Sequence, residues 1–456
     1  MKIFFKKIII YILQLESRLV LNKYKPKVVA ITGSVGKTST KDAVYAVLSE
    51  FAYVRKSEKS YNSQIGLPLT ILGVPNAWNS PTMWLKNILK GLWLVIWPHK
   101  YPEWLILEVG VGKPGDMQET ASWLSTDAVI MTAIGETPAH IEFFSSRKHL
   151  IEEKSGLIKT LKKPARNASD IADAGGAGLL ILNADDEVVL SMKSKTKNIT
   201  VTYGFQKDSD FLASEESILY VKEDENKTRS KSIPQGIMFR IDEDGSSLPV
   251  VIEGVFGRNH VYAALAALAL AHNLKLNMIQ AINSLKNYKV PPGRMRLLTG
   301  IKNTLIIDDT YNSSPFACES ALKTIGVINK ESKLKNRKIA ILGDMLELGK
   351  YTEEAHKNIG KLARENIDVL AVVGARAKAI KAGALEAGFD DENIFEFMTS
   401  VEAGEWVKTF IKKGDIVLFK GSQGMRMERA VEAILEDQEN KHDLLVRQDK
   451  EWLDKK

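Results

Sequence analysis

The chain has 456 residues, of which 45% are hydrophobic and 26% are charged, and its formal net charge is +7. This length predicts two or three domains of about 100–200 residues each, and the composition is that of a folded globular protein. The positive charge is mild and clusters only near the N-terminus, which argues against nucleic acid as a partner and leaves an anionic ligand or a membrane surface. The single cysteine, Cys318, excludes an intrachain disulfide and a cysteine-based zinc site, and favours the cytoplasm.

Residues 1–27 predict a basic amphipathic helix. Apolar residues recur at helical spacing from Phe5 to Leu19, with lysines and an arginine among them. The apolar run is too short to span a membrane, and no small-residue cleavage site follows it. Two interpretations stay open: a helix docked on its own domain, or a peripheral membrane contact through residues 1–24. A second basic and aromatic stretch, residues 82–101, is expected to be buried in the core, and a helix at a membrane surface is the alternative.

Residues 28–295 predict an α/β domain with a largely parallel sheet, because short apolar runs alternate with helical stretches. The expected strands end in glycine or in acidic residues, as buried parallel strands do where they deliver loops to a site. Between about residues 201 and 255, short alternating segments and charged turns indicate an antiparallel meander. The expected strands are KVVAITG, WLILEVG, DAVIMTAIG and GLLILNADD, and an alanine-rich helix follows at GRNHVYAALAALALAHNL.

A second α/β series predicts a Rossmann-like C-terminal domain over residues 296–437. The segment VPPGRMR is expected to link it to the central domain. Its strands are expected at NTLIIDDTYN, KIAILGDM, VLAVVGA and DIVLFKGS. Residues 438–456 form a charged tail that is expected to fray.

The segment VVAITGSVGKTSTKD predicts a phosphate site. A glycine-rich turn between a strand and a helix points backbone N–H groups at a phosphate, while a lysine neutralises the outer phosphates and a hydroxyl can hold Mg²⁺. The usual spacing has glycine where Ile31 stands, so this is a shortened variant. We therefore predict a P-loop ATPase-type domain that binds ATP through Gly33, Ser34, Val35, Gly36, Lys37, Thr38 and Ser39.

The form TGSVGKTS resembles the phosphate loop of the Mur ligase superfamily, the ATP-dependent amide-forming enzymes of peptidoglycan precursor assembly. Further segments resemble that family in order along nearly the whole chain: LEVGVGKPGDM, TAIGETPAHIEFFSSRKHLIEEKSGLI, GRNHVYAALAALALA, PPGRMR and IIDDTYNSSP. The last of these, with ILGDMLELG and VLFKGSQGMRME, is similar to the branch that adds D-alanyl-D-alanine to a UDP-N-acetylmuramoyl tripeptide. The resemblance implies a ligase that activates a carboxylate as an acyl phosphate and releases ADP and phosphate.

The resemblance also implies the residues that carry the chemistry. Lys37 would neutralise phosphate charge, and two Mg²⁺ ions would be held by Thr38, Glu108, His140 and Lys154. Family members carry the lysine at the position of Lys154 as a carbamate, which makes chemical sense because hard Mg²⁺ prefers oxygen ligands. The implied catalytic residues are therefore Lys37, Lys154 and His140.

Nucleotide and substrate contacts are implied in both domains. On the nucleotide side they fall on Asn183, Asn259, His260, Arg294, Asp308, Asp309, Tyr311 and Asn312. On the side of the muramoyl-peptide precursor and D-alanyl-D-alanine they fall on Asn62, Asp344, Glu347, Lys420 and Ser422. A monomer is expected, in the cytoplasm or at the inner membrane surface.

Two alternatives to this function stay open. Members of the resembling branch begin with a domain that binds the UDP-sugar, whereas here the phosphate loop starts at residue 33, so the acceptor is expected to be bound differently or to be another molecule. A membrane-associated ligase acting on a lipid-linked or other carboxylate acceptor is the first alternative. A non-catalytic ATP-binding regulator is the second, and the complete set of phosphate and metal residues disfavours it.

Overall fold

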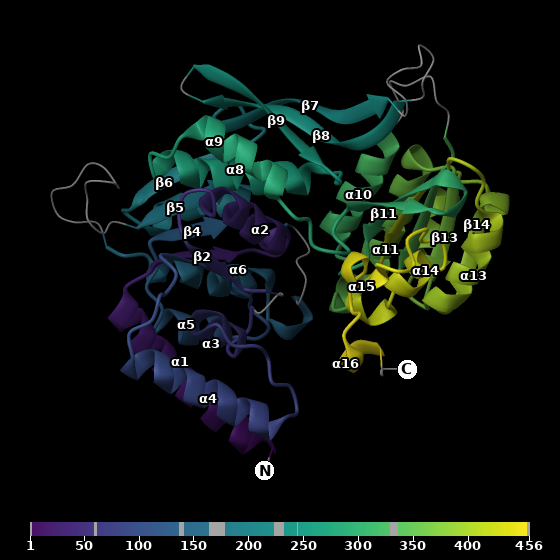
Figure 1. Ribbon diagram of the computed structural model, residues 1–456. Helices are drawn as coiled ribbons and strands as arrows, with labels where there is room; N and C mark the ends of the chain where they lie inside the picture. The colour runs from purple at the N-terminus through teal and green to yellow at the C-terminus, as the bar shows by residue number, and fades with distance from the viewer. Residues whose placement is uncertain are drawn as a thin grey trace.

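The computed structural model describes residues 2–58, 62–135, 141–163, 178–222, 232–243, 245–328 and 336–453. They form two α/β lobes that lie side by side, a central lobe around a nine-stranded sheet and a C-terminal lobe around a six-stranded sheet (Figure 1). The predicted fold class is confirmed. None of the helices within these ranges combines the length and the apolar character that crossing a bilayer requires.

The central sheet has the strand order β2-β3-β1-β4-β5-β6-β7-β8-β9. Its first six strands are parallel, β7 runs parallel to β6, and β7, β8 and β9 form the predicted antiparallel meander. The bounds are β1 Lys27–Thr32, β2 Val54–Lys56, β3 Trp104–Glu108, β4 Ala128–Met131, β5 Leu179–Asn183, β6 Ile199–Gly204, β7 Phe211–Lys222, β8 Ser232–Glu243 and β9 Ser246–Glu253.

Helices cover both faces of the parallel part of this sheet, which is why its strands are apolar throughout. Successive side chains of β1 point to opposite faces. Val29 and Ile31 pack with α2 and α8, whereas Val28 and Ala30 pack with the helices of the other face. One face carries α2 Lys37–Leu48, α8 Arg258–Asn273 and α9 Met278–Ser284, and the other α3 Gly66–Leu72, α5 Asp116–Ala121, α6 Arg147–Ser155 and α7 Glu187–Ser191.

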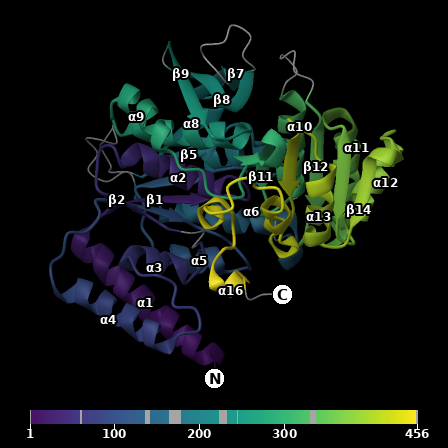
Figure 2. The same ribbon diagram turned by 45° about the vertical axis from the view of Figure 1, so that its right-hand side comes forward.

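Two further helices, α1 Lys2–Tyr24 and α4 Pro81–Ile96, lie side by side along the outer edge of the central lobe (Figures 1 and 2). α1 is docked on its own domain, because Leu13 and Val20 are buried in the core that α3 shares. The expectation that residues 82–101 are buried is wrong for α4. Only Asn87 and Gly91 of this helix are buried, since α4 packs on α1 through a narrow face.

Specific contacts fix α4 to α1. The Glu16 carboxylate lies directly over Gly91, where a Cβ atom would stand 2.1 Å from its Oε2 atom, so only glycine allows this approach. At the other end of α4, the Lys23 ammonium donates to the carbonyl oxygens of Leu94, Val95 and Trp97 at 3.0, 2.9 and 2.6 Å. A cation at a helix C-terminus satisfies free carbonyls and favours the helix dipole. The two helices therefore form one rigid unit.

The C-terminal sheet has the strand order β10-β11-β15-β12-β13-β14, and β10 alone is antiparallel to its neighbour. Residues 288–295 connect the two lobes. The strands are β10 Arg296–Gly300, β11 Thr304–Asp309, β12 Lys338–Gly343, β13 Val369–Val373, β14 Ile394–Phe397 and β15 Ile416–Lys420. The helices are α10 Pro315–Val327, α11 Thr352–Asn366 and α12 Lys378–Glu386 on one face and α13 Ser400–Phe410 and α14 Glu428–Glu432 on the other.

The end of the chain packs instead of fraying. After α15 Lys441–Leu444, the Arg447 guanidinium is buried, donates to the carbonyl oxygens of Thr310 and Tyr311, and pairs with Glu428 at 2.9 Å. Because these contacts satisfy a buried charge, the prediction of a fraying tail is wrong for this segment. α16 Lys450–Leu453 follows it.

Candidate active site

A cavity of about 850 Å³ lies where the carboxyl ends of β1 and β3 meet the C-terminal lobe. Both lobes and the segment between them contribute side chains, which places the predicted phosphate loop opposite the predicted nucleotide residues. Of the residues predicted from the sequence, the cavity is lined by Ser34, Val35, Gly36, Lys37, Thr38, Ser39, Asn62, Glu108, Lys154, Asn259, His260, Arg294, Asp309, Tyr311, Asn312 and Lys420.

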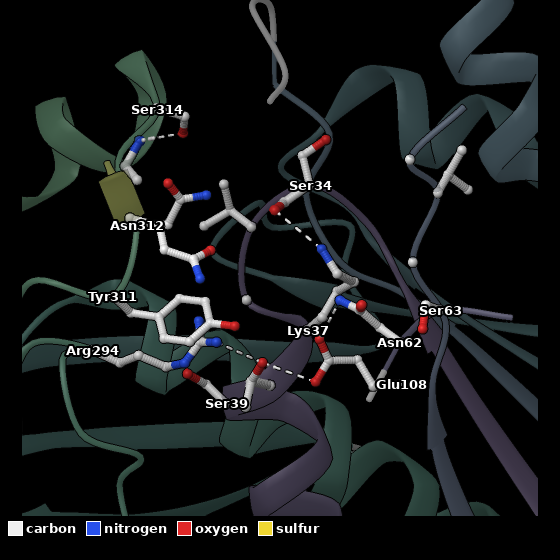
Figure 3. A pocket seen from close by; sticks show the side chains of 18 of the residues that line it. Ser34, Lys37, Ser39, Asn62, Ser63, Glu108, Arg294, Tyr311, Asn312 and Ser314 are labelled. Atoms are coloured by element: carbon white, nitrogen blue, oxygen red, sulfur yellow. Dashed lines mark hydrogen bonds between the residues drawn. The ribbon is translucent and has the colours of Figure 1, made fainter. Parts of the chain in front are cut away.

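The phosphate loop packs against the end of β4. Gly33 has a φ of 149°, and a Cβ atom there would lie 2.0 Å from the Thr132 hydroxyl, so the close approach requires glycine. The N–H groups of Ser34 and Val35 donate to the Ala133 carbonyl, at 2.7 and 3.1 Å. The Lys37 ammonium folds back on the loop and donates to the carbonyl oxygens of Gly33 and Ser34 (Figure 3). A phosphate entering the cavity would meet this lysine at the start of α2.

A carboxylate and a hydroxyl meet beside the loop. Glu108 is buried at the end of β3, directly opposite Ile31 of β1 in the sheet. One of its oxygens accepts from the Thr38 hydroxyl at 2.8 Å and the other from the Asn62 amide at 3.2 Å (Figure 3). Hydroxyl, carboxylate and amide oxygens are ligands that suit Mg²⁺. Within the described ranges no three His, Cys, Asp or Glu side chains gather as a metal cluster, so phosphate oxygens and water would complete the coordination.

Lys41 is a residue that the sequence reasoning missed. It stands one helical turn after Lys37 and is buried, with its ammonium 3.7 Å from Asp42 and 3.9 Å from Glu108. Lys56 also pairs with Asp42, at 2.5 Å. Burial lowers the pKa of Lys41, and the two carboxylates oppose that shift. The i, i+4 spacing to Lys37 in GKTSTK was the signal that both lysines share one face of α2.

Lys154 of α6 is buried beneath the phosphate loop. Its side chain is 2% exposed, and its amine donates to the Gly33 carbonyl oxygen at 3.1 Å, the same oxygen that Lys37 approaches at 2.8 Å. Burial, and then the charge of Lys37, lower the pKa of Lys154 well below its usual value of 10.5. This position therefore favours a neutral amine, which is the reactive form of lysine.

The segment between the lobes carries Arg294 across to the phosphate loop. Its guanidinium donates to the Thr38 hydroxyl at 2.8 Å and lies over the Tyr311 ring, 3.9 Å from its centroid (Figure 3). His260 holds this segment in place, because its ring bonds to the Tyr288 hydroxyl at 2.8 Å and to the Arg294 carbonyl at 2.9 Å. Burial lowers the pKa of His260 to about 4, so the ring is neutral. Both of its nitrogens are already engaged in positioning Arg294.

The C-terminal lobe presents a paired lysine to the cavity. Lys420 at the end of β15 is buried, forms an ion pair with Asp309 of β11 at 2.5 Å, and donates to the Asn312 carbonyl at 3.0 Å. In the sheet Asp309 lies directly opposite Lys420. The pair fixes the turn that carries Tyr311 and Asn312 at the cavity wall.

Gly33 and five further predicted site residues do not line the cavity, and in four of these five the side chain accepts a hydrogen bond from a backbone N–H group of the protein. Asn183 accepts from the Asp185 N–H, and Asp308 accepts from the Gly293 and Thr310 N–H groups. Burial raises the pKa of Asp308 to about 6. The other three are Asp344, which accepts from the Ala377 N–H, Ser422, which accepts from the Leu346 N–H, and Glu347, which is half-buried outside the cavity. His140 lies outside the described residues.

The cavity wall also contains residues to which the sequence assigned no role. Ile10 of α1 reaches it from the outer helix pair. Asp116 accepts from the N–H groups of Gly112 and Lys113, both at 3.0 Å, and from the Gln64 amide at 3.2 Å. Lys113 and Asp116 stand within the quoted segment LEVGVGKPGDM, of which only Glu108 was assigned a role. Phe143 lines the same cavity.

The fold and this site define a Mur ligase, and the comparisons agree. Residues 31–271 match the Mur ligase middle domain and residues 293–423 match the domain described as Mur ligase, glutamate ligase domain. Because the first match alone covers more than half of the chain, the chain belongs to the Mur ligase family.

Among its relatives, UDP-N-acetylmuramoyl-tripeptide–D-alanyl-D-alanine ligase of Bacillus subtilis is 28% identical over 427 residues, 93% of this chain and 79% of the relative. The enzyme of the same name from Escherichia coli is 25% identical over 417 residues, 90% of this chain and 77% of the relative. The crystal structure of MurF ligase from Thermotoga maritima in complex with ADP superposes with a TM-score of 0.71 at 24% identity, covering 93% and 83% of the two chains. This last likeness shows the fold.

Proposed function

We propose that the chain is an ATP-dependent, ADP-forming peptide ligase of peptidoglycan precursor synthesis that joins the carboxylate of a muramoyl tripeptide to the amine of D-alanyl-D-alanine. The observation that carries this proposal is a single cavity in which the phosphate loop of one lobe, Glu108 and the interlobe Arg294 converge. The Bacillus subtilis and Escherichia coli relatives named for this activity align with 93% and 90% of the chain.

The reaction needs a leaving group on a carboxylate. A carboxylate oxygen of the acceptor attacks the γ-phosphorus of ATP, which gives an acyl phosphate and ADP. The amine of D-alanyl-D-alanine then attacks the acyl carbon, loses a proton, and expels phosphate as the amide forms. Because the first step brings two anions together, positive charge at the transferred phosphoryl group is the main requirement.

The residues of the cavity meet that requirement from three directions. Lys37 and the N-terminal end of α2 are proposed to face the phosphates from the central lobe. Arg294 reaches the same place from the interlobe segment. Thr38 and Glu108 fit a Mg²⁺ ion, which when bound offsets phosphate charge, and a second Mg²⁺ is proposed at Lys154, with His140 beyond the described residues.

We propose that Lys154 acts as a carbamate. Its burial and its lowered pKa supply the neutral amine that reacts with CO₂, and the product would be an anionic oxygen group beneath the loop that the amine now contacts. An unmodified ammonium beside Lys37 would instead repel both that lysine and a metal. The carbamate therefore converts a repulsive neighbour into an oxygen ligand that Mg²⁺ accepts.

The remaining proposed roles concern the nucleotide and the acceptor. Asn259, Asp309, Tyr311 and Asn312 are proposed to face the ribose and base of ATP, and Asn62 and Lys420 the acceptor and its phosphates. The proposed domain limits are 1–27 for the N-terminal helix, 28–295, 296–437 and 438–456. A monomer in the cytoplasm is proposed as the working form.

A second candidate function has one specific observation in its favour. Ile10 of α1 lines the cavity. The same helix exposes apolar side chains on its outer face. A ligase of the same chemistry that takes a lipid-linked acceptor would use this arrangement, with the acceptor entering along α1.

The test is ADP release by the full chain with Mg²⁺, ATP and D-alanyl-D-alanine, against UDP-linked and lipid-linked muramoyl tripeptides. The proposal predicts ADP formation only when an acceptor and the dipeptide are both present. Faster turnover of the lipid-linked acceptor would favour the second function. ATP hydrolysis that neither compound changes would contradict both.

A further inference from the structure

The outer helix pair gathers an unusual share of exposed apolar surface. Of the 25 large apolar side chains that are exposed in the described residues, twelve belong to residues 8–19 and 78–97. Scattered exposed apolar side chains are ordinary, whereas a contiguous apolar patch marks an interaction surface.

The pattern places these side chains on one face of each helix. Residues spaced three or four apart share a helix face. In α1 the exposed apolar series is Ile8, Tyr11, Leu15 and Leu19, and in α4 it is Leu85, Leu89, Leu92 and Ile96, which are 39, 68, 46, 43, 58, 56, 46 and 55% exposed. We call these eight residues the α1–α4 face. Both views place the pair along the outer edge of the lobe, opposite the β7–β9 meander (Figures 1 and 2).

The charged residues of the two helices and their flanking segments are almost all positive. Residues 2–25 and 75–102 contain nine lysines and arginines and a single acidic residue, Glu16. Glu16 is buried under α4, so it offers no charge to a partner. Lys86 and Lys90 each follow a leucine of the α1–α4 face by one residue, and therefore flank the apolar stripe.

Aromatic side chains complete the pattern at the same edge. Trp93 and Trp97 are half exposed and stack on each other, with ring centroids 4.4 Å apart. Indole rings are amphipathic and favour the level of lipid headgroups, and lysine side chains keep their charge in water while their stems lie on apolar surface. A helix face that combines apolar residues with flanking lysines and tryptophans is suited to lie in a bilayer surface.

We propose that the α1–α4 face docks on the surface of a bilayer that contains anionic phospholipid. Apolar burial and positive charge act together in such docking. A second copy of the chain fits less well, since a symmetric contact would bring only positive charges together at its rim. Docking itself is independent of the proposed ligase function. Only the consequence drawn below, that docking places the ligase cavity near the lipid, rests on that function.

Docking would hold the cavity wall to which α1 contributes beside the lipid. Ile10 stands in the cavity wall while Ile8 and Tyr11 are exposed on the outer face of the same helix. Gln14 of α1 also donates to Glu119 at 3.0 Å, and Glu119 in turn accepts from Gln64 of the cavity wall. The thickness of one α-helix, about 10 Å, thus separates the bilayer from the acceptor site.

The test is co-sedimentation of the full chain with vesicles of phosphatidylcholine containing phosphatidylglycerol, and with vesicles of phosphatidylcholine alone. We expect binding to the anionic vesicles that weakens as ionic strength rises. The affinity of the variant Leu89→Glu/Ile96→Glu for the anionic vesicles should be lower by about tenfold or more, because two leucine-sized side chains are no longer buried in lipid. Both positions are exposed, so its melting temperature and its ADP release with a UDP-linked acceptor should match the wild type.

A matched control separates the face from general charge. Ile279→Glu/Val401→Glu adds the same two charges at exposed apolar positions of α9 and α13 and should bind vesicles as the wild type does. Equal weakening in both variants, or no vesicle binding by the wild type, would overturn the proposal. So would a wild-type dimer that Leu89→Glu/Ile96→Glu converts to a monomer without any lipid binding. Vesicle binding without ATP turnover would overturn the ligase proposal alone.

Discussion

The buried amine of Lys154 gives a prediction whose magnitude follows from the structure. Lys154 and Lys37 donate to one carbonyl oxygen, at 3.1 and 2.8 Å, so their nitrogens lie within about 6 Å of each other. Two positive charges at that separation repel by about 3 kcal/mol at an effective dielectric constant of about 20. Burial and this repulsion both lower the pKa of Lys154. Because only the neutral amine reacts with CO₂, adduct formation should begin at a lower pH than at an ordinary lysine.

The assay is ¹³C nuclear magnetic resonance of the protein in ¹³C-bicarbonate between about pH 6 and about pH 9. A carbamate signal should grow as pH rises and should disappear in Lys154→Gln. Lys41→Gln is the matched control, since Lys41 is also buried with a lowered pKa but is held by Asp42 and Glu108, and it should keep the signal.

Activity should follow the adduct. Lys154→Ala should be nearly inactive, and a small carboxylate such as propionate should restore part of the ADP release by placing an anionic oxygen in the vacated space. Lys154→Arg should stay inactive, because a guanidinium keeps its charge and forms no carbamate. A signal that survives in Lys154→Gln, or wild-type turnover of Lys154→Arg without CO₂, would refute the reasoning.

Three further predictions concern other residues. Lys37→Ala should abolish ADP release with little change in melting temperature, since this side chain serves phosphate charge; retained turnover would remove the loop from the mechanism. Glu108→Ala should shift the Mg²⁺ titration of activity to higher concentration, and a titration that superimposes on the wild type would contradict a metal role. Burial raises the pKa of Glu16 to about 7 from 4.5, so the folded state binds this proton more tightly and wild-type stability should fall as pH rises from about 4.5 to about 7. At about pH 8 the variant Glu16→Gln should therefore have a higher melting temperature than the wild type, and its free energy of unfolding should be larger by up to about 3 kcal/mol. If the difference in melting temperature between variant and wild type were the same at about pH 4.5 and about pH 8, Glu16 would be solvated.

The sequence predicted the parts of the site that neighbouring residues determine together. The turn from β1 into α2 places Gly33, Lys37 and Thr38 by local geometry, and Glu108 follows from its place at the end of an apolar strand in the same sheet. Asp308 and Asp309 mark the limit of this reasoning. Both end β11, but successive side chains point to opposite faces, so Asp309 meets Lys420 at the cavity while Asp308 binds backbone N–H groups.

Features that depend on distant contacts could not be predicted in this way. The composition of residues 82–101 led to the expectation of a buried stretch, but how much of a helix is covered depends on its neighbours, and only Asn87 and Gly91 of α4 are buried. Arg447 is charged and close to the C-terminus, and its burial depends on carbonyl groups 136 and 137 residues earlier in the chain. Likewise Ile10 reaches the cavity only because α1 packs across α3.

The central claim is that the acceptor carboxylate is activated by phosphoryl transfer in the cavity between the lobes. It is tested most directly by labelling that carboxylate with ¹⁸O and measuring the mass of the phosphate released during ligation to D-alanyl-D-alanine. Activation through an acyl phosphate predicts that each phosphate carries one ¹⁸O atom from the acceptor and that ADP is the other product. Unlabelled phosphate, or AMP and pyrophosphate in place of ADP, would contradict the claim.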